Sequence, residues 1–388
     1  MQESVRMKTL ELVFFDAGGG HRSAANALCE AVRRQQRPAE KAWDMPLMNL
    51  QELLDEMDVF RKLTGIRMQD IYNQMLQRGW TLGSAQLVPL MHGVIRAFHR
   101  QQVNLLVNYW KARKPDMVVS VIPNFNRAIF DAMRIALPGV PLVTILTDMA
   151  DYPPHFWMEH QPQYLICGTQ KAYRQALEMG HTKDRVFLVS GMILNPRFYD
   201  PIEVDRLKDR EALGLDPNLP TILMMFGGEG SAKMLEIARI LNQSGLRLQI
   251  LAICGKNERL RERMNAMPRT IPTRIEGFTK DVPRFMRLSD IFIGKPGPGS
   301  ISEAVALGLP VIVECNSWTL PQERYNADWV EEQGVGIALR NFREGVTQAV
   351  RRMIEPVERS KFIARVGKLN NRAVFEIPEI LEQILEKR

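Results

Sequence analysis

The chain has 388 residues, of which 45% are hydrophobic and 24% charged, and its formal net charge is +7. This length exceeds one ordinary domain and suits two, and the composition is that of a globular protein. No apolar run approaches the length of a membrane span, and the positive charge calls for an acidic partner: nucleic acid, anionic lipid or phosphate.

The start of the chain and its four cysteines both indicate a reducing compartment. Residues 1–21 contain acidic side chains and run directly into a first strand, so we expect no secretory signal. The cysteines are scattered without paired spacing, which argues against a disulfide framework and against a zinc site. We therefore expect a cytoplasmic protein.

The first half of the chain alternates strand and helix patterns. Leu10–Phe15 predicts a strand, Asp16–His21 a glycine turn and Ser23–Gln35 a helix. Further strands are expected at 116–122, 141–147, 164–167 and 185–189. This order of elements predicts an α/β domain with one doubly wound parallel sheet.

A long insertion, residues 43–115, interrupts that alternation and has a mostly helical pattern. Its part from 61 to 114 holds nine basic residues against one acid, a local excess larger than the net charge of the whole chain. Basic side chains mixed with apolar and tryptophan side chains are typical of a segment that lies on an anionic membrane surface. The alternative is a solvated basic face on a helical insertion.

The second half begins after a proline-rich break at 191–219, where we place the domain linker. The predicted domains are 1–195 and 196–365, and a C-terminal helix within 366–388 is expected to pack back across the linker. Strands of the second domain are expected at 221–226, 248–253, 273–275, 291–293 and 311–314. The pattern therefore predicts two similar α/β domains with a cleft between them.

The stretch from Ile291 to Pro310 joins a buried strand to a helix through a glycine-proline turn. We expect Ser300 at the N-cap of that helix and Glu303 one turn further in. Such a turn faces the ligand edge of a parallel sheet, where a helix N-terminus suits phosphate and Glu303 can accept hydrogen bonds from a ribose. The same two residues also match a capping box, which needs no ligand.

Two more glycine turns carry candidate chemistry. The turn Gly227–Gly230 (GGEG) follows a strand and opens a helix, but it has the spacing of neither a P-loop nor a dinucleotide fold. Together with the turn at 295–300 it suggests two sets of backbone N–H groups around a diphosphate. His21 follows the first glycine turn of the chain, where an imidazole can act as a general base. The alternative is a histidine that only bonds its own turn.

Polar side chains follow the strand that ends at Glu314. Gln322, Glu323 and Asn326 can hydrogen-bond sugar hydroxyls from there, although a solvated helix start would contain the same residues. Asp148 and Asp151 do not have the Asp-x-Asp spacing that holds a metal in metal-dependent sugar transfer. We therefore predict no metal site.

Together these motifs resemble one family. They are, in order, DAGGGH (16–21), GGEG (227–230), Gly277-Phe278, KPGPGSISEA (295–304), Gly308–Pro310 and PQERYN (321–326). The chain resembles the monogalactosyldiacylglycerol synthases and the bacterial processive diacylglycerol glucosyltransferases. More distantly, it resembles the N-acetylglucosaminyl transferase of peptidoglycan lipid synthesis. The likeness extends from about residue 10 to residue 336.

The resemblance implies a GT-B fold, in which two Rossmann-like domains face each other across a cleft. It implies inverting transfer of galactose or glucose from UDP-galactose or UDP-glucose to diacylglycerol or a related lipid, with His21 as the base and no cofactor or metal. The implied UDP-binding residues are Gly227, Gly228, Glu229, Gly230, Gly277, Phe278, Gly297, Gly299, Ser300 and Glu303. The implied donor-sugar residues are Gly20, Gln322, Glu323 and Asn326.

The resemblance also implies partners and a location. The partners are a UDP-sugar, a membrane lipid acceptor and an anionic membrane surface contacted through 61–114; no nucleic acid is expected, because that segment lacks a known reader motif. The protein would be peripheral on the inner face of the cell membrane. Alternatives are another acceptor for the same kind of transfer, or an epimerase that acts on the UDP-sugar. At 123–126 and 148–157, on the acceptor side, the chain departs from the plant-type pattern.

Overall fold

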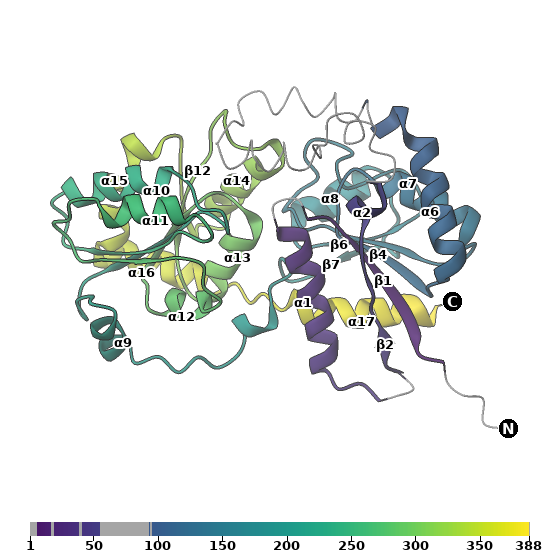
Figure 1. Cartoon of the computed structure of the whole chain (residues 1–388), viewed down its shortest axis with the longest axis horizontal. Helices are drawn as coiled ribbons and strands as arrows, with labels where there is room; N and C mark the ends of the chain where they lie inside the picture. Colours follow the sequence, from purple (N-terminus) through teal and green to yellow (C-terminus); the bar gives the residue numbers. More distant parts are fainter. Residues whose placement is uncertain (1–5, 17–18, 39–40, 55–92, 94, 388) are drawn as a thin grey trace. The chain divides into compact units, whose positions relative to one another are not determined.

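The computed structural model describes residues 6–16, 19–38, 41–54, 93 and 95–387, and it divides the chain into two compact units (Figure 1). Unit 1 contains the described residues up to Pro196 and those from Arg372 onward. Unit 2 contains Arg197–Asn371. Among the described residues, the chain after Asn371 therefore belongs to unit 1 again and forms its last helix.

The sheet of unit 1 is parallel, in the order β2-β1-β4-β5-β6-β7, with β3 also paired to β1. Its strands are β1 (Lys8–Phe14), β2 (Trp43–Asp44), β3 (Leu47–Asn49), β4 (Met117–Ser120), β5 (Leu142–Ile145), β6 (Tyr164–Cys167) and β7 (Val186–Leu188). Every residue of β4 and β5 is buried, as expected for central strands that helices cover on both faces. The predicted doubly wound parallel sheet is therefore present.

Helices of unit 1 pack on this sheet and on each other. They are α1 (Gly20–Arg34), α2 (Leu50–Leu54), α6 (His99–Arg113), α7 (Asn126–Ala136), α8 (Gln170–Glu178) and α17 (Ala373–Glu386). The helix α6 packs against α7, and the C-terminal helix α17 packs against α1. The alanine-rich face of α1 allows close approach, because Ala24, Ala25 and Ala27 are all buried.

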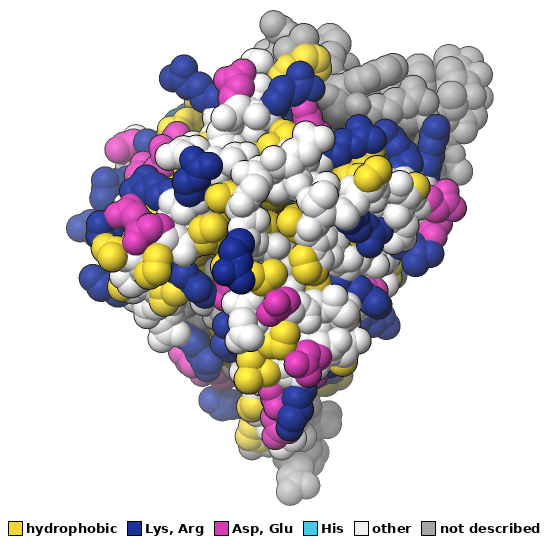
Figure 2. All heavy atoms as spheres, turned by 90° about the vertical axis from the view of Figure 1, so that its left-hand side faces the viewer, with side chains coloured by type: hydrophobic (Ala, Val, Ile, Leu, Met, Phe, Trp, Pro, Cys, Tyr) yellow, Lys and Arg dark blue, Asp and Glu magenta, His cyan; other side chains and the backbone are white. Residues whose placement is uncertain are grey.

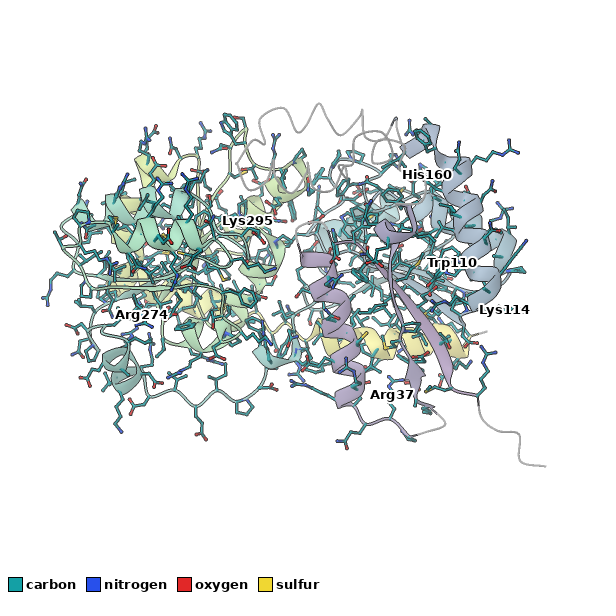
Figure 3. The ribbon with its side chains drawn as sticks, in the orientation of Figure 1. Arg37, Trp110, Lys114, His160, Arg274 and Lys295 are labelled. Atoms are coloured by element: carbon teal, nitrogen blue, oxygen red, sulfur yellow. The ribbon has the colours of Figure 1, made fainter. Side chains whose placement is uncertain are left out.

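The prediction of a mostly helical insertion is wrong at its start, where the structure places β2 and β3. Both strands are too short to show a two-residue period, and pairing with β1 stabilises them instead. Much of the basic segment 61–114 lies outside the described residues. Its end forms α6, in which Trp110 is fully buried (Figure 3) and donates from Nε1 to Glu11 Oε2 over 2.6 Å. Trp110 is therefore a core residue and not a membrane contact.

The sheet of unit 2 is also parallel, in the order β10-β9-β8-β11-β12-β13. Its strands are β8 (Thr221–Met225), β9 (Gln249–Ile253), β10 (Thr273–Glu276), β11 (Ile291–Gly294), β12 (Val311–Glu314) and β13 (Gly336–Leu339). Its helices are α9 (Arg206–Ala212), α10 (Lys233–Gln243), α11 (Glu258–Asn265), α12 (Val282–Arg287), α13 (Pro298–Ala306), α14 (Arg324–Glu332), α15 (Phe342–Ile354) and α16 (Pro356–Val366). The predicted strands are confirmed, with β10 at the edge, and β13 adds one that the pattern did not predict.

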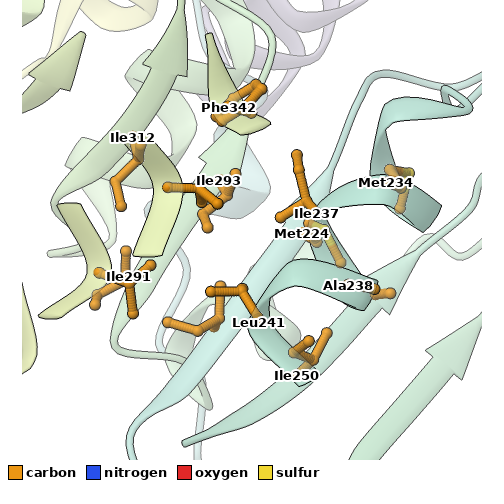
Figure 4. Packing of buried hydrophobic residues seen from close by; sticks show 14 of the residues in the cluster. Met224, Met234, Ile237, Ala238, Leu241, Ile250, Ile291, Ile293, Ile312 and Phe342 are labelled. Carbon is orange, nitrogen blue, oxygen red and sulfur yellow. The ribbon is translucent and has the colours of Figure 1, made fainter. Parts of the chain in front are cut away.

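The core of unit 2 forms where α10 and α15 cover the sheet (Figure 4). Met224 of β8, Ile250 of β9 and Ile293 of β11 point toward Ile237 and Leu241 of α10, and all five side chains are fully buried. Burying side chains of this size contributes about 1.5–3 kcal/mol each. The central strands β8 and β11 are therefore held firmly, and the loops that leave them start from fixed points.

The outer face of the molecule seen in Figure 2 shows Lys and Arg side chains interspersed with Asp, Glu and apolar side chains. Among the described residues drawn there, no broad field of one charge appears. Within the described parts of the chain, no helix is both long and apolar enough to cross a bilayer.

Candidate functional site

The helix α13 begins at Pro298, with Gly297 as its N-cap at φ −74° and ψ 132°. The prediction of Ser300 as N-cap is therefore wrong. Proline suits the first helical position, because its ring fixes φ and the missing N–H would have no intrahelical partner there. Ser300 lies in the first turn instead, and no side-chain hydrogen bond caps the helix. The capping-box interpretation of Ser300 and Glu303 is thereby excluded.

Three sequence motifs of unit 2 meet around Lys295, just before α13 (Figure 3). Lys295 Nζ lies 3.0 Å from Glu323 Oε1. A Cβ atom placed on Gly227 would lie 3.7 Å from Lys295 Cε. Because β8, β11 and β12 are neighbours in a parallel sheet, the segments that follow them gather at the same carboxyl edge. The structure thus brings together the GGEG turn, the KPGPG turn and the PQE segment.

A second loop supports the GGEG turn. Lys256 N donates to Gly228 O over 2.8 Å, and a Cβ atom on Gly255 would come within 2.1 Å of that same oxygen. Gly255 also has a φ of +62°, which favours glycine. Gly255 was not predicted from the sequence, although a glycine two residues after the end of the strand β9 was an available signal. Gly228 itself is exposed and has open space around it.

Gly277 and Phe278 follow the edge strand β10, next to the same loop. Phe278 is 61% exposed, and Lys256 Nζ lies 6.0 Å from the centre of its ring. An exposed phenylalanine contributes little to the core, and an exposed ring of this kind can stack on a planar group. A Cβ atom on Gly277 would contact Arg261 Cδ at 3.5 Å, so this glycine is less tightly constrained than Gly255.

Glu303 lies in the second turn of α13, and its carboxyl group is largely withdrawn from water. Burial raises its pKa to about 7, and the charge of Arg197 partly opposes this shift. None of the hydrogen bonds among the described residues involves this carboxyl group. A half-buried acid without a hydrogen-bond partner is suited to receive hydroxyl groups from a ligand.

The three predicted donor-sugar residues of unit 2 differ in what they do within the fold. Asn326 is fully buried, and its Nδ2 donates to Pro296 O over 2.7 Å, which ties α14 to the turn before α13. Its Oδ1 has no partner among the described residues. Glu323 holds Lys295, and Gln322 lies half-buried beside it on the same short 3-10 turn, Pro321–Glu323. Asn326 therefore positions the turn, while Gln322 and Glu323 are each partly exposed.

In unit 1, His21 is the second residue of α1, just after Gly19, whose φ is +77°. Its Nδ1 lies 3.2 Å from Thr147 Oγ1, and its ring centre lies 5.9 Å from that of Trp157. Burial lowers the pKa of His21 to about 4, although a backbone hydrogen bond with Val121 acts the other way. The imidazole is therefore neutral near pH 7, and it bonds the end of a distant strand instead of its own turn. The adjacent Gly20 is exposed, with open space where a side chain would be.

The loop at 148–157 forms the wall beside His21, and two acids shape it. Trp157 Nε1 donates to Asp148 Oδ2 over 2.9 Å, and Trp157 N donates to Asp151 Oδ1 over 2.6 Å. Both carboxyl groups are thus engaged in holding Trp157. Among the described residues, no three His, Cys, Asp or Glu side chains are placed to hold a metal ion together.

Residues 222–367 match the model of the glycosyltransferase family 28 C-terminal domain. Over 366 residues, 90% of this chain and 74% of the relative, the chain is 28% identical to a probable chloroplastic monogalactosyldiacylglycerol synthase 2 from Oryza sativa subsp. japonica.

Two solved structures are similar in fold. MurG from Acinetobacter baumannii matches with a TM-score of 0.62 at 13% identity, covering 97% of this chain and 100% of that one. UDP-GlcNAc 2-epimerase from Neisseria meningitidis, in a structure bound to UDP-GlcNAc, matches with a TM-score of 0.59 at 15% identity, covering 98% and 100%.

These matches define the class first: the protein has the GT-B fold of two Rossmann-like units, and residues 222–367 of its second unit match the glycosyltransferase family 28 C-terminal domain. The more particular resemblance, to the monogalactosyldiacylglycerol synthases, is confirmed over most of the chain. The predicted fold class is therefore confirmed. The predicted cleft between the domains and the roles of the site residues stay predictions.

Proposed function

We propose that this protein is an inverting glycosyltransferase that moves galactose or glucose from a UDP-sugar to diacylglycerol or a related membrane lipid. The observation that carries the proposal is the meeting of the GGEG turn, the start of α13 and the Lys295–Glu323 pair at one edge of the unit 2 sheet. The similarity to monogalactosyldiacylglycerol synthases over most of the chain supports the lipid acceptor.

In this proposal unit 2 binds the donor. The diphosphate lies at the N-terminus of α13, near Gly297, Gly299 and Ser300, and against the backbone of Gly227–Gly230, because unsatisfied N–H groups and the helix dipole favour negative charge. Phe278 stacks on the uracil. The Neisseria epimerase, which shares the fold and is bound to UDP-GlcNAc in its structure, supports this class of donor.

The remaining donor contacts use side chains. The Glu303 carboxyl accepts hydrogen bonds from the ribose hydroxyls, and Gln322 and Glu323 bind the hydroxyls of the sugar. Gly20 is a further proposed donor-sugar residue. Asn326 acts by holding the turn at Pro296. As the bond to the sugar breaks, charge develops on the diphosphate, and fixed backbone donors stabilise that charge without having to reorganise.

His21 is the proposed general base. A proton on Nδ1, donated to Thr147 Oγ1, leaves the lone pair of Nε2 available. Nε2 then removes the proton from the acceptor hydroxyl while the oxygen attacks C1 of the sugar, on the side opposite the diphosphate. The transition state resembles an oxocarbenium ion, as in glycoside hydrolysis, and one displacement inverts the configuration. The lowered pKa keeps the imidazole in its basic form at neutral pH.

The acceptor requires contact with a membrane. We propose that the basic segment 61–114 binds the anionic inner surface of the cell membrane, so that the enzyme is cytoplasmic and peripheral. The composition of that segment supports this location. Reversing the charge of several of its lysines and arginines should then reduce binding to anionic liposomes, and unchanged binding would refute the surface role.

Product analysis tests the proposal directly. The purified protein is incubated with labelled UDP-galactose, UDP-glucose or UDP-N-acetylglucosamine and with liposomes of diacylglycerol and anionic lipid. Label in a lipid from one donor would support the transfer and identify the sugar. A second candidate, epimerisation of the UDP-sugar, is favoured by the fold shared with the Neisseria enzyme. It predicts a changed or released sugar without liposomes and no labelled lipid.

A further inference from the structure

Unit 2 contains a cavity of about 440 Å³ at the edge of the sheet opposite the proposed nucleotide site. Its walls come from the segment before α9, the end of α12, the start of β11, the α13–β12 turn and α16. Figure 1 shows α9, α12 and α16 close together on one side of unit 2. Asp290 directly precedes β11 and Leu309 precedes β12, so the cavity lies at the amino edge of the parallel strands.

Positive charge dominates the walls of this cavity. Arg206, Arg287 and Arg359 line it, and Asp290 is the single carboxylate that does so. Apolar side chains, including Leu309 and Ile363, form the rest of the lining. A cavity of this size with apolar walls and a few convergent charges has the features of a small-molecule site.

The one carboxylate is already fully engaged. Asp290 accepts from Arg206 Nη2 and Arg210 Nη2 over 2.7 Å each, and from Arg359 Nη2 over 2.5 Å. Thr221 N donates to it over 2.8 Å. Burial acts to raise the pKa of Asp290, but the arginines outweigh it, so that the pKa is lowered. Asp290 is therefore an anion that three cations share.

Two of the arginines retain unused donors. Arg359 Nε is buried and has no hydrogen-bond partner among the described residues. Arg287 is exposed and forms no ion pair with any residue in the described part of the chain. Like charges gathered in a partly buried site are unfavourable unless an anion balances them, and guanidinium groups bind phosphate through pairs of parallel hydrogen bonds.

We propose that this cavity binds a phosphate group, as free phosphate or as a phosphomonoester whose organic part lies on the apolar wall. Arg287 and Arg359 supply the hydrogen bonds, and Arg206 completes the positive field. The site is separate from the diphosphate site at α13, because it lies at the opposite ends of the same strands. It does not depend on the proposed transferase reaction.

The test is calorimetric titration of the full-length protein with sodium phosphate, at constant ionic strength and in the presence of saturating UDP, which occupies the donor site. The proposal predicts saturable binding that Arg287→Gln and Arg359→Gln each weaken at least about tenfold, since a charge-assisted hydrogen bond lost to a ligand changes affinity by this order. Arg287→Gln is the sharper variant, because Arg287 makes no ion pair among the described residues whose loss would disturb Asp290.

Controls separate a specific site from general charge and from misfolding. Arg343→Gln removes an arginine whose side chain is 75% exposed and pairs with Glu236 at the surface, so phosphate binding should not change. Arg287→Gln and Arg343→Gln should keep the melting temperature of the wild type, whereas Arg359→Gln loses its ion pair with Asp290 and should lower it. All three variants should keep their affinity for UDP. If wild-type protein and the Arg287 and Arg359 variants take up phosphate equally, the cavity is not the site and the proposal is overturned.

A vesicle arm distinguishes the source of the phosphate. Flotation with vesicles of equimolar phosphatidylcholine and phosphatidate, against pure phosphatidylcholine, reports a lipid headgroup. If vesicle binding depends on Arg287 and Arg359 but phosphate binding in the titration does not, the site binds a lipid phosphomonoester. If phosphate binding in the titration depends on them but vesicle binding does not, the site binds a soluble phosphate compound. If neither vesicle binding nor phosphate binding changes when these arginines are replaced, the proposed site is rejected.

Discussion

His21 combines two properties that a base needs: a lone pair on Nε2 and a hydrogen bond that orients the ring. Because burial lowers its pKa to about 4, the basic form predominates at all pH values above about 5. We expect His21→Ala to reduce kcat by about a hundredfold to ten-thousandfold, the range typical of a lost general base, with UDP affinity unchanged. Steady-state rates and UDP titration measure the two effects.

The pH profile gives an independent check on His21. The acid limb of kcat for the wild type, measured at saturating donor so that the ionisation of Glu303 does not affect donor binding, should lie near pH 4 instead of near 6.5, the ordinary pKa of histidine. Thr147→Val, which removes the hydrogen bond to Nδ1, should lower kcat while leaving donor affinity unchanged. An acid limb near 6.5 would show that the titrating group is not a buried imidazole, and near-normal turnover of His21→Ala would remove the base assignment.

Glu303 should make UDP binding depend on pH. Its carboxyl ionises around pH 7, and the ionised form is the stronger acceptor for ribose hydroxyls. We expect the affinity of the wild type for UDP to exceed that of Glu303→Gln by about tenfold near pH 8 and by less near pH 6. Ionisation of the diphosphate itself changes the UDP affinity of both proteins equally, so it does not contribute to the difference between them. A constant difference across this range would contradict a ribose contact by the carboxylate.

The same carboxyl group should affect stability in the opposite direction. The native state keeps its proton up to about pH 7, whereas the unfolded chain loses it near the ordinary value of 4.5. The native state therefore binds more protons between these values, and the free energy of unfolding falls as pH rises through them. Glu303→Gln cannot ionise, so its unfolding free energy, measured by chemical denaturation at each pH, should fall less over the same range.

At the scale of elements, the loop after β9 holds the GGEG turn in place. Gly255→Ala would combine a left-handed backbone with a contact of 2.1 Å to Gly228 O. The strain of about 1–2 kcal/mol and the overpacking of about 1–3 kcal/mol should lower the free energy of unfolding by a few kcal/mol. The displaced turn should also weaken UDP binding. Chemical denaturation and UDP titration measure both.

Gly228→Ala is the matched control for Gly255→Ala. Gly228 is exposed, has no positive φ and has open space where a Cβ atom would lie, so the fold should tolerate alanine without loss of stability. If the diphosphate approaches this backbone as proposed, the added methyl group should still raise the KM for the donor. Equal stability of both variants would show that the two loops do not depend on each other.

The central strands of unit 2 could be predicted well because they are apolar runs bounded by glycine and proline. The start of α13 was predicted wrongly, because Ser300 and Glu303 fit a capping pattern locally. Pro298 is favoured at the first position of a helix, and the helix begins at this proline instead. The strand β2 has only two residues, and in β13 only Gly336 is buried, so neither shows the buried apolar run of a central strand. Pairing with β1 stabilises β2, and pairing with β12 stabilises β13.

The candidate site was predictable to the extent that its residues are close in sequence. The glycine turns were recognisable because phosphate binding needs backbone without side chains. The contact of His21 with Thr147 joins residues 126 positions apart, and the tie from Asn326 to Pro296 joins residues 30 positions apart. Such contacts depend on how strands are ordered in the sheet, which a local pattern does not contain.

At the scale of the whole molecule, the last helix belongs to the first unit. Five large aliphatic side chains of α17 are buried: Val374, Ile377, Leu381, Ile384 and Leu385. The chain around its start is tied down further, since Ser190 N donates to Glu376 Oε2 over 2.8 Å and Arg372 N donates to Ser190 Oγ over 2.6 Å. At about 1.5–3 kcal/mol per buried side chain, α17 contributes as much as the whole net stability of an ordinary domain.

We therefore expect the two units to respond differently to cutting the chain. A fragment of residues 197–371 contains its whole sheet, its core and the proposed nucleotide residues, so it should unfold cooperatively and bind UDP nearly as tightly as the full chain, apart from contacts made by unit 1. A fragment of residues 1–196 lacks α17 and should be unstable, and adding a peptide of residues 372–388 should restore part of its structure. Circular dichroism and UDP titration measure these outcomes.

Leu381→Asp in the full chain should destabilise unit 1 alone, whereas Glu379→Ala, on the exposed side of α17, should not. If the fragment 1–196 unfolded cooperatively by itself with the stability of the intact unit, α17 would not be part of its core, because a helix that buries this much apolar surface cannot be removed without cost.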